Sequence, residues 1–193
     1  NIKGSLLGVL DKTKPAMGAR RIKKMLREPL NDAIKINDRL NAVEEIYLDP
    51  LLENDLIESL KKIYDFERLA ARIATGTANG KDLIALRNSI AVLPNIKADL
   101  SSSGSNLLKD IHDGISNLED IADLITESIS ENAGFTIKEG GLIIDGYSED
   151  LDNLKASIKD AKAWIAGLEA HERERTGIKT LKVGYNKVFG YYI

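Results

Sequence analysis

The sequence predicts a mainly α protein with a helical body, a long coiled-coil-like helix projecting from it, and a small β portion. Three observations support this prediction. Apolar residues recur at helical spacing through most of the first 130 residues, and the breaks between the predicted helices are short. Residues 148–176 then continue without a strong helix breaker. Two short runs of β-favouring residues follow them.

Prolines and capping residues predict the helix boundaries of the body. Residues 16–27 form a helix that Pro29 ends, because proline lacks an amide proton and clashes with the preceding turn. Asn31 or Asp32 caps the next helix, and Pro50 suits the first turn of a third. The remaining predicted elements are a helix over 65–74 ending at Gly76, a helix over 81–93 ending before Pro94, a loop over 101–105, and a helix opened by a Ser116–Glu119 capping box.

The character of the sequence changes near residue 132. Residues 135–137 and 142–144 favour β structure and flank the pair Gly140-Gly141, so they predict a small hairpin. We therefore expect two domains. The helical body spans residues 1–133, and the second domain spans residues 134–193.

A single long helix dominates the predicted second domain. Ser148 caps it and acids follow in the first turn, where they complement the helix dipole. About 29 residues in a helix span roughly 43 Å. Apolar residues alternate three and four positions apart, as in a coiled-coil seam: Leu151, Leu154, Ile158, Ala161, Ile165 and Leu168. No other segment has a comparable length, so we expect the partner helix to lie outside this sequence, or the exposed seam to self-associate.

The chain ends in a basic, aromatic segment that the pattern predicts as two strands, 180–183 and 188–193, joined by a turn. The first 30 residues carry a net charge of +6 and residues 171–193 carry +3. The whole chain is −3, so the 140 residues between carry −12. This distribution excludes bulk nucleic-acid binding along the chain and leaves local phosphate contact at its ends. The candidate phosphate contacts are Lys179, Lys182, Asn186 and Lys187, whereas Arg173 and Arg175 also suit the end of the long helix.

The residues present indicate no catalytic centre and no cofactor site. Cysteine is absent, which excludes disulfides and thiolate chemistry. The segment 76–82 resembles a phosphate-binding loop but has three residues between its glycines instead of four, and Asp82 follows Lys81 where a Ser or Thr is needed. It therefore predicts a turn between two helices. Charged residues interrupt every apolar run before it could span a membrane.

Several motifs resemble the MutS family of DNA mismatch-repair proteins over essentially the whole chain. Residues 4–14, with Met17-Gly18-Ala19-Arg20 and Pro29-Leu30, resemble the opening of that family's helical lever (core) domain. Asp65-Phe66-Glu67-Arg68 resembles its D-L-E-R segment, with Phe replacing Leu. Residues 172–193, E-R-E-R-T-G-I-K-T-L-K-V-G-Y-N-K-V-F-G-Y-Y-I, are the most specific match. Pro15 and Met25 depart from the family pattern, where Thr and Trp are more common.

The resemblance implies the first half of a lever followed by the first part of a clamp domain that grips the DNA backbone. It implies that the full-length protein is a homodimer that binds mismatched double-stranded DNA, uses ATP and magnesium, works with a MutL-type partner and acts in the bacterial cytoplasm at the nucleoid. Because the chain begins at Asn1 and ends within a predicted strand, we expect it to be a segment of that protein, without an activity or cofactor of its own. Three alternatives remain: a helical adaptor that binds a protein through the long helix, an enzyme domain, and a MutS relative that controls recombination.

Overall fold

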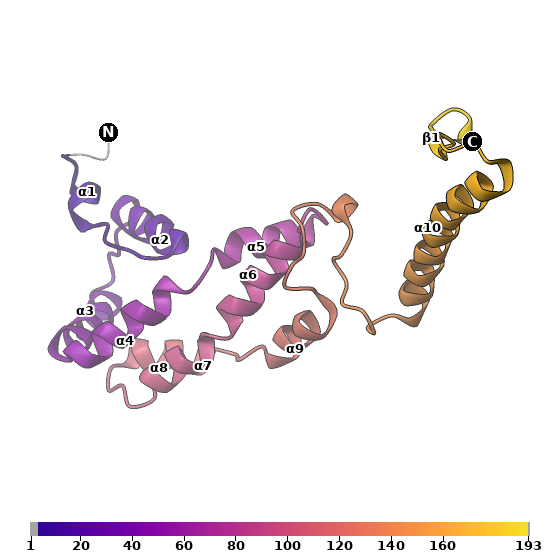
Figure 1. Cartoon of the computed structure of the whole chain (residues 1–193). Coiled ribbons are helices and arrows are strands. Elements are labelled where there is room, and N and C mark those ends of the chain that lie inside the picture. The colour runs from indigo at the N-terminus through magenta and orange to yellow at the C-terminus, as the bar shows by residue number, and fades with distance from the viewer. Residues whose placement is uncertain (1–3, 193) are drawn as a thin grey trace. The chain divides into compact units, whose positions relative to one another are not determined.

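The computed structural model describes residues 4–192 and is mainly α, as the sequence predicts (Figure 1). Contacts divide the chain into two compact units, and the division falls between Ile144 and Asp145. Residues 134–144, which the sequence places in the second domain, group with the first unit. The reason is local pairing, since Ile143 forms an isolated antiparallel bridge with Ile129.

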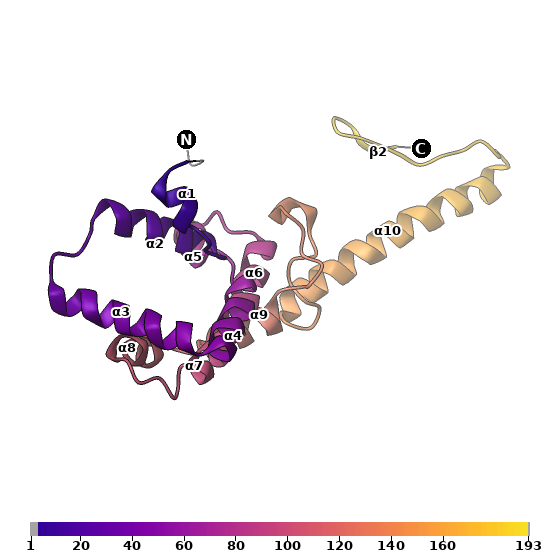
Figure 2. The same cartoon turned by 90° about the vertical axis from the view of Figure 1, so that its left-hand side faces the viewer.

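The first unit is a series of short helices joined by short connections (Figures 1 and 2). The described elements are α1 (Leu6–Leu10), α2 (Ala16–Arg27), α3 (Ala33–Leu48), α4 (Pro50–Lys61), α5 (Phe66–Ala74), α6 (Gly80–Ile90), α7 (Leu93–Asp99), α8 (Asn106–Gly114), α9 (Glu119–Ser128) and a 3-10 turn, η1 (Ile137–Glu139). The helices pack in pairs, α3 with α4 and α8, α4 with α7, and α6 with α5 and α9. The unit is therefore a chain of packed pairs.

Several helix starts follow from their caps as the sequence predicts. The Asp32 carboxylate accepts hydrogen bonds from the amides of Ile34 and Lys35 at the start of α3. Pro50 is the first residue of α4. Such caps satisfy amides that have no partner within the helix. The helix predicted to end at residue 93 ends earlier, at Ile90, and Pro94 lies in the first turn of the next helix, α7, where a missing amide proton costs nothing.

Two separate hydrophobic clusters form the interior of the first unit. The first gathers side chains from α3, α7 and α8 and their surroundings: Ala42, Val92, Ile96, Leu100 and Leu108. The second gathers Ile125, Ile129 and Ala133, with partly buried residues of α6 against them. Ile90, at the end of α6, is 2% exposed. Ile125 of α9 and Ile129, directly after that helix, are both 6% exposed and so bury the end of α9 against α6.

Two local predictions for this unit are wrong. The Ser116–Glu119 capping box does not form, because α9 begins after Leu118, whose backbone is left-handed at φ 53° and whose side chain makes no cap. The predicted hairpin around Gly140 does not form either. Residues 137–139 make a 3-10 turn, and the segment after the glycines pairs with the end of α9 through Ser130 N to Leu142 O at 2.9 Å and Ile144 N to Ser128 O at 3.0 Å.

The second unit contains the long helix and a two-stranded sheet. Helix α10 spans Glu149–Thr176, so its predicted extent is confirmed. The Ser148 hydroxyl accepts a hydrogen bond from the Leu151 amide over 3.4 Å, and Gly177 ends the helix in the left-handed conformation at φ 71°. The antiparallel strands are β1 (Gly184–Asn186) and β2 (Gly190–Tyr192). The predicted strand over 180–183 is wrong, because residues 184–186 supply β1 and residues 180–183 lead up to it. The turn falls at 187–189, so the second predicted strand begins at Gly190 and not at Val188.

Candidate nucleic-acid interface

The end of α10 fixes the segment that leads to the hairpin. The Arg173 guanidinium donates from Nε to the Leu181 carbonyl over 2.7 Å and pairs with Glu169 at 2.5 Å. Glu169 in turn accepts a hydrogen bond from the Val183 amide over 3.1 Å. Residues 177–183 are therefore held against the last turns of the helix by polar contacts, and β1 starts from a fixed point.

The second arginine of this region is also engaged within the chain. Arg175 donates from Nε to the Glu172 carboxylate over 2.9 Å and forms an ion pair with it at 2.7 Å. Hydrogen bonding from Arg175 lowers the pKa of Glu172, and the same pairing raises the pKa of Arg175. The sequence allowed Arg173 and Arg175 either a structural role or a phosphate contact. In the structure, both have partners near the end of α10.

The three candidate lysines are, in contrast, exposed to solvent. Lys179, Lys182 and Lys187 lie on the hairpin or the segment before it, and none has an ion pair in the described part of the chain. Asn186 is exposed at the end of β1, and its side-chain oxygen accepts a hydrogen bond from the Val188 amide over 2.8 Å. The Asn186 side chain therefore fixes the turn, and its amide nitrogen makes no hydrogen bond to a described residue.

Aromatic and aliphatic side chains crowd the same hairpin. Tyr185 and Tyr191 face each other across the strands with ring centroids 5.0 Å apart and planes tilted by 59°. In the turn, Val188 is 82% exposed and Phe189 is 83% exposed. Exposed aromatic residues between lysines are typical of surfaces that contact nucleic acid. Sequence reasoning identified the aromatic residues but did not single out Val188, because its exposure depends on the position of the turn.

The predicted seam of α10 is partly exposed along the helix. Leu154 is 61% exposed and Ile158 is 56% exposed, whereas Leu151, Ile165 and Leu168 are half-buried. Ala161 is exposed, and Trp164 beside the seam is 68% exposed. Within residues 145–192, α10 is the one helix. The seam therefore has no helical partner in the described part of its own unit.

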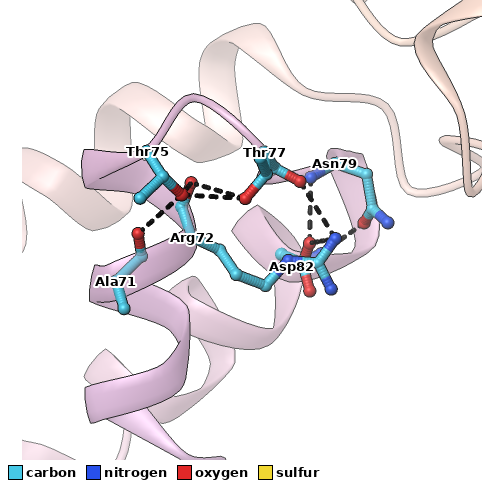
Figure 3. A network of polar contacts seen from close by, with 6 residues as sticks. All are labelled: Ala71, Arg72, Thr75, Thr77, Asn79 and Asp82. Carbon is cyan, nitrogen blue, oxygen red and sulfur yellow. Dashed lines mark hydrogen bonds and ion pairs between the residues drawn. The ribbon is translucent and has the colours of Figure 1, made fainter.

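In the segment that resembles a phosphate-binding loop, the polar groups bond to one another and to Arg72 of α5 (Figure 3). Asn79 and Asp82 form a reciprocal capping box at the start of α6, with distances of 3.0 Å and 2.9 Å. Arg72 pairs with Asp82 at 3.0 Å and donates to the Thr77 carbonyl over 3.0 Å. The carboxylate of Asp82 is thus engaged by Asn79 and Arg72, and the segment forms the turn that links α5 to α6.

The described residues offer no group of three or more His, Asp or Glu side chains placed to hold a metal ion. Over residues 4–192, no helix combines the length and the apolar character that crossing a membrane requires.

Comparison with known proteins identifies the family. Residues 1–182 match the family model described as MutS domain III. The DNA mismatch repair protein MutS of Alkaliphilus oremlandii is 51% identical over 193 residues, which are 100% of this chain and 22% of that protein. The MutS proteins of Desulforamulus reducens and Clostridium perfringens are 49% and 50% identical over 191 residues, 99% of this chain and 22% and 21% of theirs. The chain spans about a fifth of the length of these curated relatives. The chain therefore belongs to the MutS family and corresponds to its domain III.

Proposed function

We propose that the first unit is part of a helical lever and that the second unit is the first part of a clamp that contacts the DNA backbone without reading sequence. One observation carries the clamp assignment. At the hairpin and the segment before it, Lys179, Lys182 and Lys187 are exposed and have no ion pair to a described residue, whereas the neighbouring Arg173 and Arg175 are engaged inside the helix end. Unpaired lysines suit phosphates, which position a protein on the duplex and carry no base information.

The lever assignment rests on how the first unit is linked. Successive elements are joined by arginine–carboxylate pairs, Arg72 with Asp82 between α5 and α6, and Arg87 with Glu131 between α6 and the segment after α9. The two hydrophobic clusters lie in different sets of helices. Ion pairs that tie neighbouring elements together in this way suit an element that transmits movement along its length.

For the whole protein, we propose the activity that the names of its relatives state, DNA mismatch repair. It would act as a homodimer on mismatched double-stranded DNA, with ATP and magnesium bound outside this segment and a MutL-type partner, in the bacterial cytoplasm at the nucleoid. The relatives' name favours this role over recombination control. We assign no enzymatic activity to the segment itself. Its one resemblance to a phosphate-binding loop, over residues 76–82, fails because Asp82 follows Lys81 and pairs with Arg72.

The salt dependence of DNA binding tests the proposed clamp. Each phosphate contact contributes roughly −0.9 to the slope of log affinity against log salt concentration. In the full-length protein, Lys182→Ala with Lys187→Ala removes two contacts, so the slope becomes less negative by roughly 1.8. The matched control is Lys159→Ala with Lys162→Ala, which removes two exposed lysines of α10 that have no ion pair in the described chain. An unchanged slope for the hairpin variant, or an equal change in the control, would remove these lysines from the interface.

A second candidate function is a helical adaptor that binds a protein through the seam. The exposure of Leu154 and Ile158 favours it. Leu154→Ser with Ile158→Ser would then abolish capture of a protein partner in a nuclease-treated extract and leave the salt slope of DNA binding unchanged. In a clamp, the same variant would instead weaken DNA binding, because the seam would then pack on the partner helix expected outside this sequence and support the hairpin.

A further inference from the structure

Residues 4–28, the N-terminal segment, contribute nothing to the interior of the first unit. Neither α1 nor α2 contains a buried residue, and neither hydrophobic cluster includes one of theirs. The apolar side chains of α2, such as Met17, Ile22 and Met25, are half-buried, and α2 packs with α1. A helix of 12 residues is marginal in water on its own. The segment therefore needs another attachment to stay folded in place.

That attachment is an ionic contact, which we call the Arg20 clasp (Arg20, Asp65 and Glu67). The Arg20 guanidinium donates to both oxygens of Asp65, from Nη1 over 2.8 Å and from Nη2 over 2.6 Å. Its Nε donates to Glu67 over 2.8 Å. Among the described residues, every ion pair between the N-terminal segment and the rest of the first unit involves Arg20. Paired, planar hydrogen bonds of this kind are stronger than a single lysine contact.

The acidic side of the clasp is rigidly held. Asp65 caps α5, accepting a hydrogen bond from the Arg68 amide over 3.2 Å, and its side chain is 19% exposed. The preceding residue, Tyr64, donates its amide to the buried Ser89 of α6. The hydrogen bond from Arg20 lowers the pKa of Asp65 to about 2, so the carboxylate is charged at neutral pH. Asp65 and its surroundings therefore form a preformed receiving site, whereas the N-terminal segment that binds there is not part of a hydrophobic core.

The N-terminal segment also carries charges that the clasp does not use. Lys12, Arg21, Lys23 and Arg27 have no ion pair in the described part of the chain. The segment is basic and its receiving site is acidic, so attraction between them is electrostatic. Attraction between exposed charges weakens as salt shortens the screening length, from about 30 Å at 0.01 M to about 10 Å at 0.1 M.

We propose that the N-terminal segment is a detachable module, which docks on the first unit through the Arg20 clasp and leaves it, with loss of helix α2, when the clasp opens. The docked state keeps α2 folded, and the open state frees a basic segment next to a preformed acidic site. Ionic strength sets the balance between the two states.

Amide hydrogen exchange of peptides from residues 16–27 in the full-length protein tests this proposal. Arg20→Gln removes the clasp, and we expect α2 to exchange roughly tenfold faster than in the wild type, the effect of losing a paired, charge-assisted contact. In the wild type, raising salt from about 0.05 M to about 0.5 M accelerates exchange in α2. Peptides from α6 serve as the internal reference and stay unchanged.

Three further variants separate the clasp from general effects of charge. Arg21→Gln removes the same charge from a residue without an ion pair, and α2 then exchanges as in the wild type. Asp65→Asn keeps a capping side chain for α5 but removes the carboxylate, so it accelerates α2 without accelerating α5. Arg20→Lys gives an intermediate rate, because lysine keeps the charge but not the paired geometry. Equal exchange of α2 in Arg20→Gln and the wild type, or exchange independent of salt, would overturn the proposal.

Discussion

The buried hydroxyl of Ser89 accepts a hydrogen bond from the Tyr64 amide over 2.9 Å, although 25 residues separate the two in sequence. The same hydroxyl donates to the Ala85 carbonyl over 2.8 Å, and Ser89 is 0% exposed. Tyr64 belongs to the connection between α4 and α5, whereas Ser89 belongs to α6. One side chain thus links the helices of the first hydrophobic cluster to those of the second.

Replacing Ser89 by alanine leaves the Tyr64 amide without its partner at this link. The bond is partly buried and Tyr64 is 54% exposed, so we expect Ser89→Ala to lower the free energy of unfolding by the net value of one hydrogen bond, about 0.5–1.5 kcal/mol. Ser128→Ala is the control, because the Ser128 hydroxyl is also buried but donates only to Leu124 in its own helix. We expect the control to change stability by less than about 0.5 kcal/mol. Urea unfolding of both variants measures the difference, and equal losses would contradict the link.

Gly80 occupies a site where a methyl group does not fit. A Cβ atom there would overlap Ala133 and lie 2.6 Å from Leu142 Cδ1, and these two residues hold the segment after α9 against α6. Gly80→Ala therefore destabilises the first unit by about 1–3 kcal/mol through overpacking. Gly167, inside α10, has open space at the same position. Gly167→Ala should stabilise α10 by about 0.5–1 kcal/mol. Thermal unfolding followed by circular dichroism measures the melting temperature of each variant. The melting temperature should fall for Gly80→Ala and rise for Gly167→Ala.

Glu45 caps a helix other than its own. From α3, its carboxylate accepts hydrogen bonds from the amides of Gly104 over 2.7 Å and Ser105 over 2.8 Å, at the start of α8. These bonds lower the pKa of Glu45. Glu45→Ala should cost about 1–2 kcal/mol, the usual value of a cap, and free the loop over 101–105. Glu44→Ala, at an exposed neighbouring acid, should be nearly neutral. Faster amide exchange in the loop of the Glu45 variant alone confirms the cap.

Acid opens the Arg20 clasp within a defined pH range. The pKa of Asp65 falls from 3.8 to about 2 in the folded protein, chiefly through hydrogen bonding from Arg20. A lowered carboxyl pKa stabilises the fold fully above the unfolded value, near pH 4, and this contribution is lost as the pH falls through about 2. The stability difference between the wild type and Asp65→Asn should therefore shrink between about pH 4 and about pH 2. Urea unfolding over that range measures it, and a constant difference would contradict the assignment.

Local rules predicted much of the helical structure. The helix over residues 16–27 and the helix start at Pro50 were predicted correctly, because prolines and capping residues act within one turn of the helix. The extent of α10 was correct because Ser148 and Gly177 mark its two ends. The hairpin around Gly140 was wrong because residues 142–144 pair with the end of α9, a tertiary contact that the local pattern does not contain.

For the candidate interface, the sequence predicted which residue types are present but not where each of them lies. The lysines and aromatic residues were identified from the sequence, but the strand register placed Lys187 in the turn and Asn186 at the end of a strand. The engagement of Arg173 with Leu181 could not be predicted, because it depends on how the chain folds back after Gly177. Similarly, no local signal indicates that Arg20 reaches Asp65 across 45 residues.

The most direct test of the proposed clamp compares two DNA duplexes on the same protein. Full-length wild type and the Lys182→Ala, Lys187→Ala variant are titrated with a matched duplex and with one that carries a single mismatch, at one fixed salt concentration. Phosphate contacts carry no base information, so the variant should lose affinity for both duplexes by the same factor, and the ratio between them should stay constant. A loss confined to the mismatched duplex, or no loss on either, would contradict the proposed backbone grip.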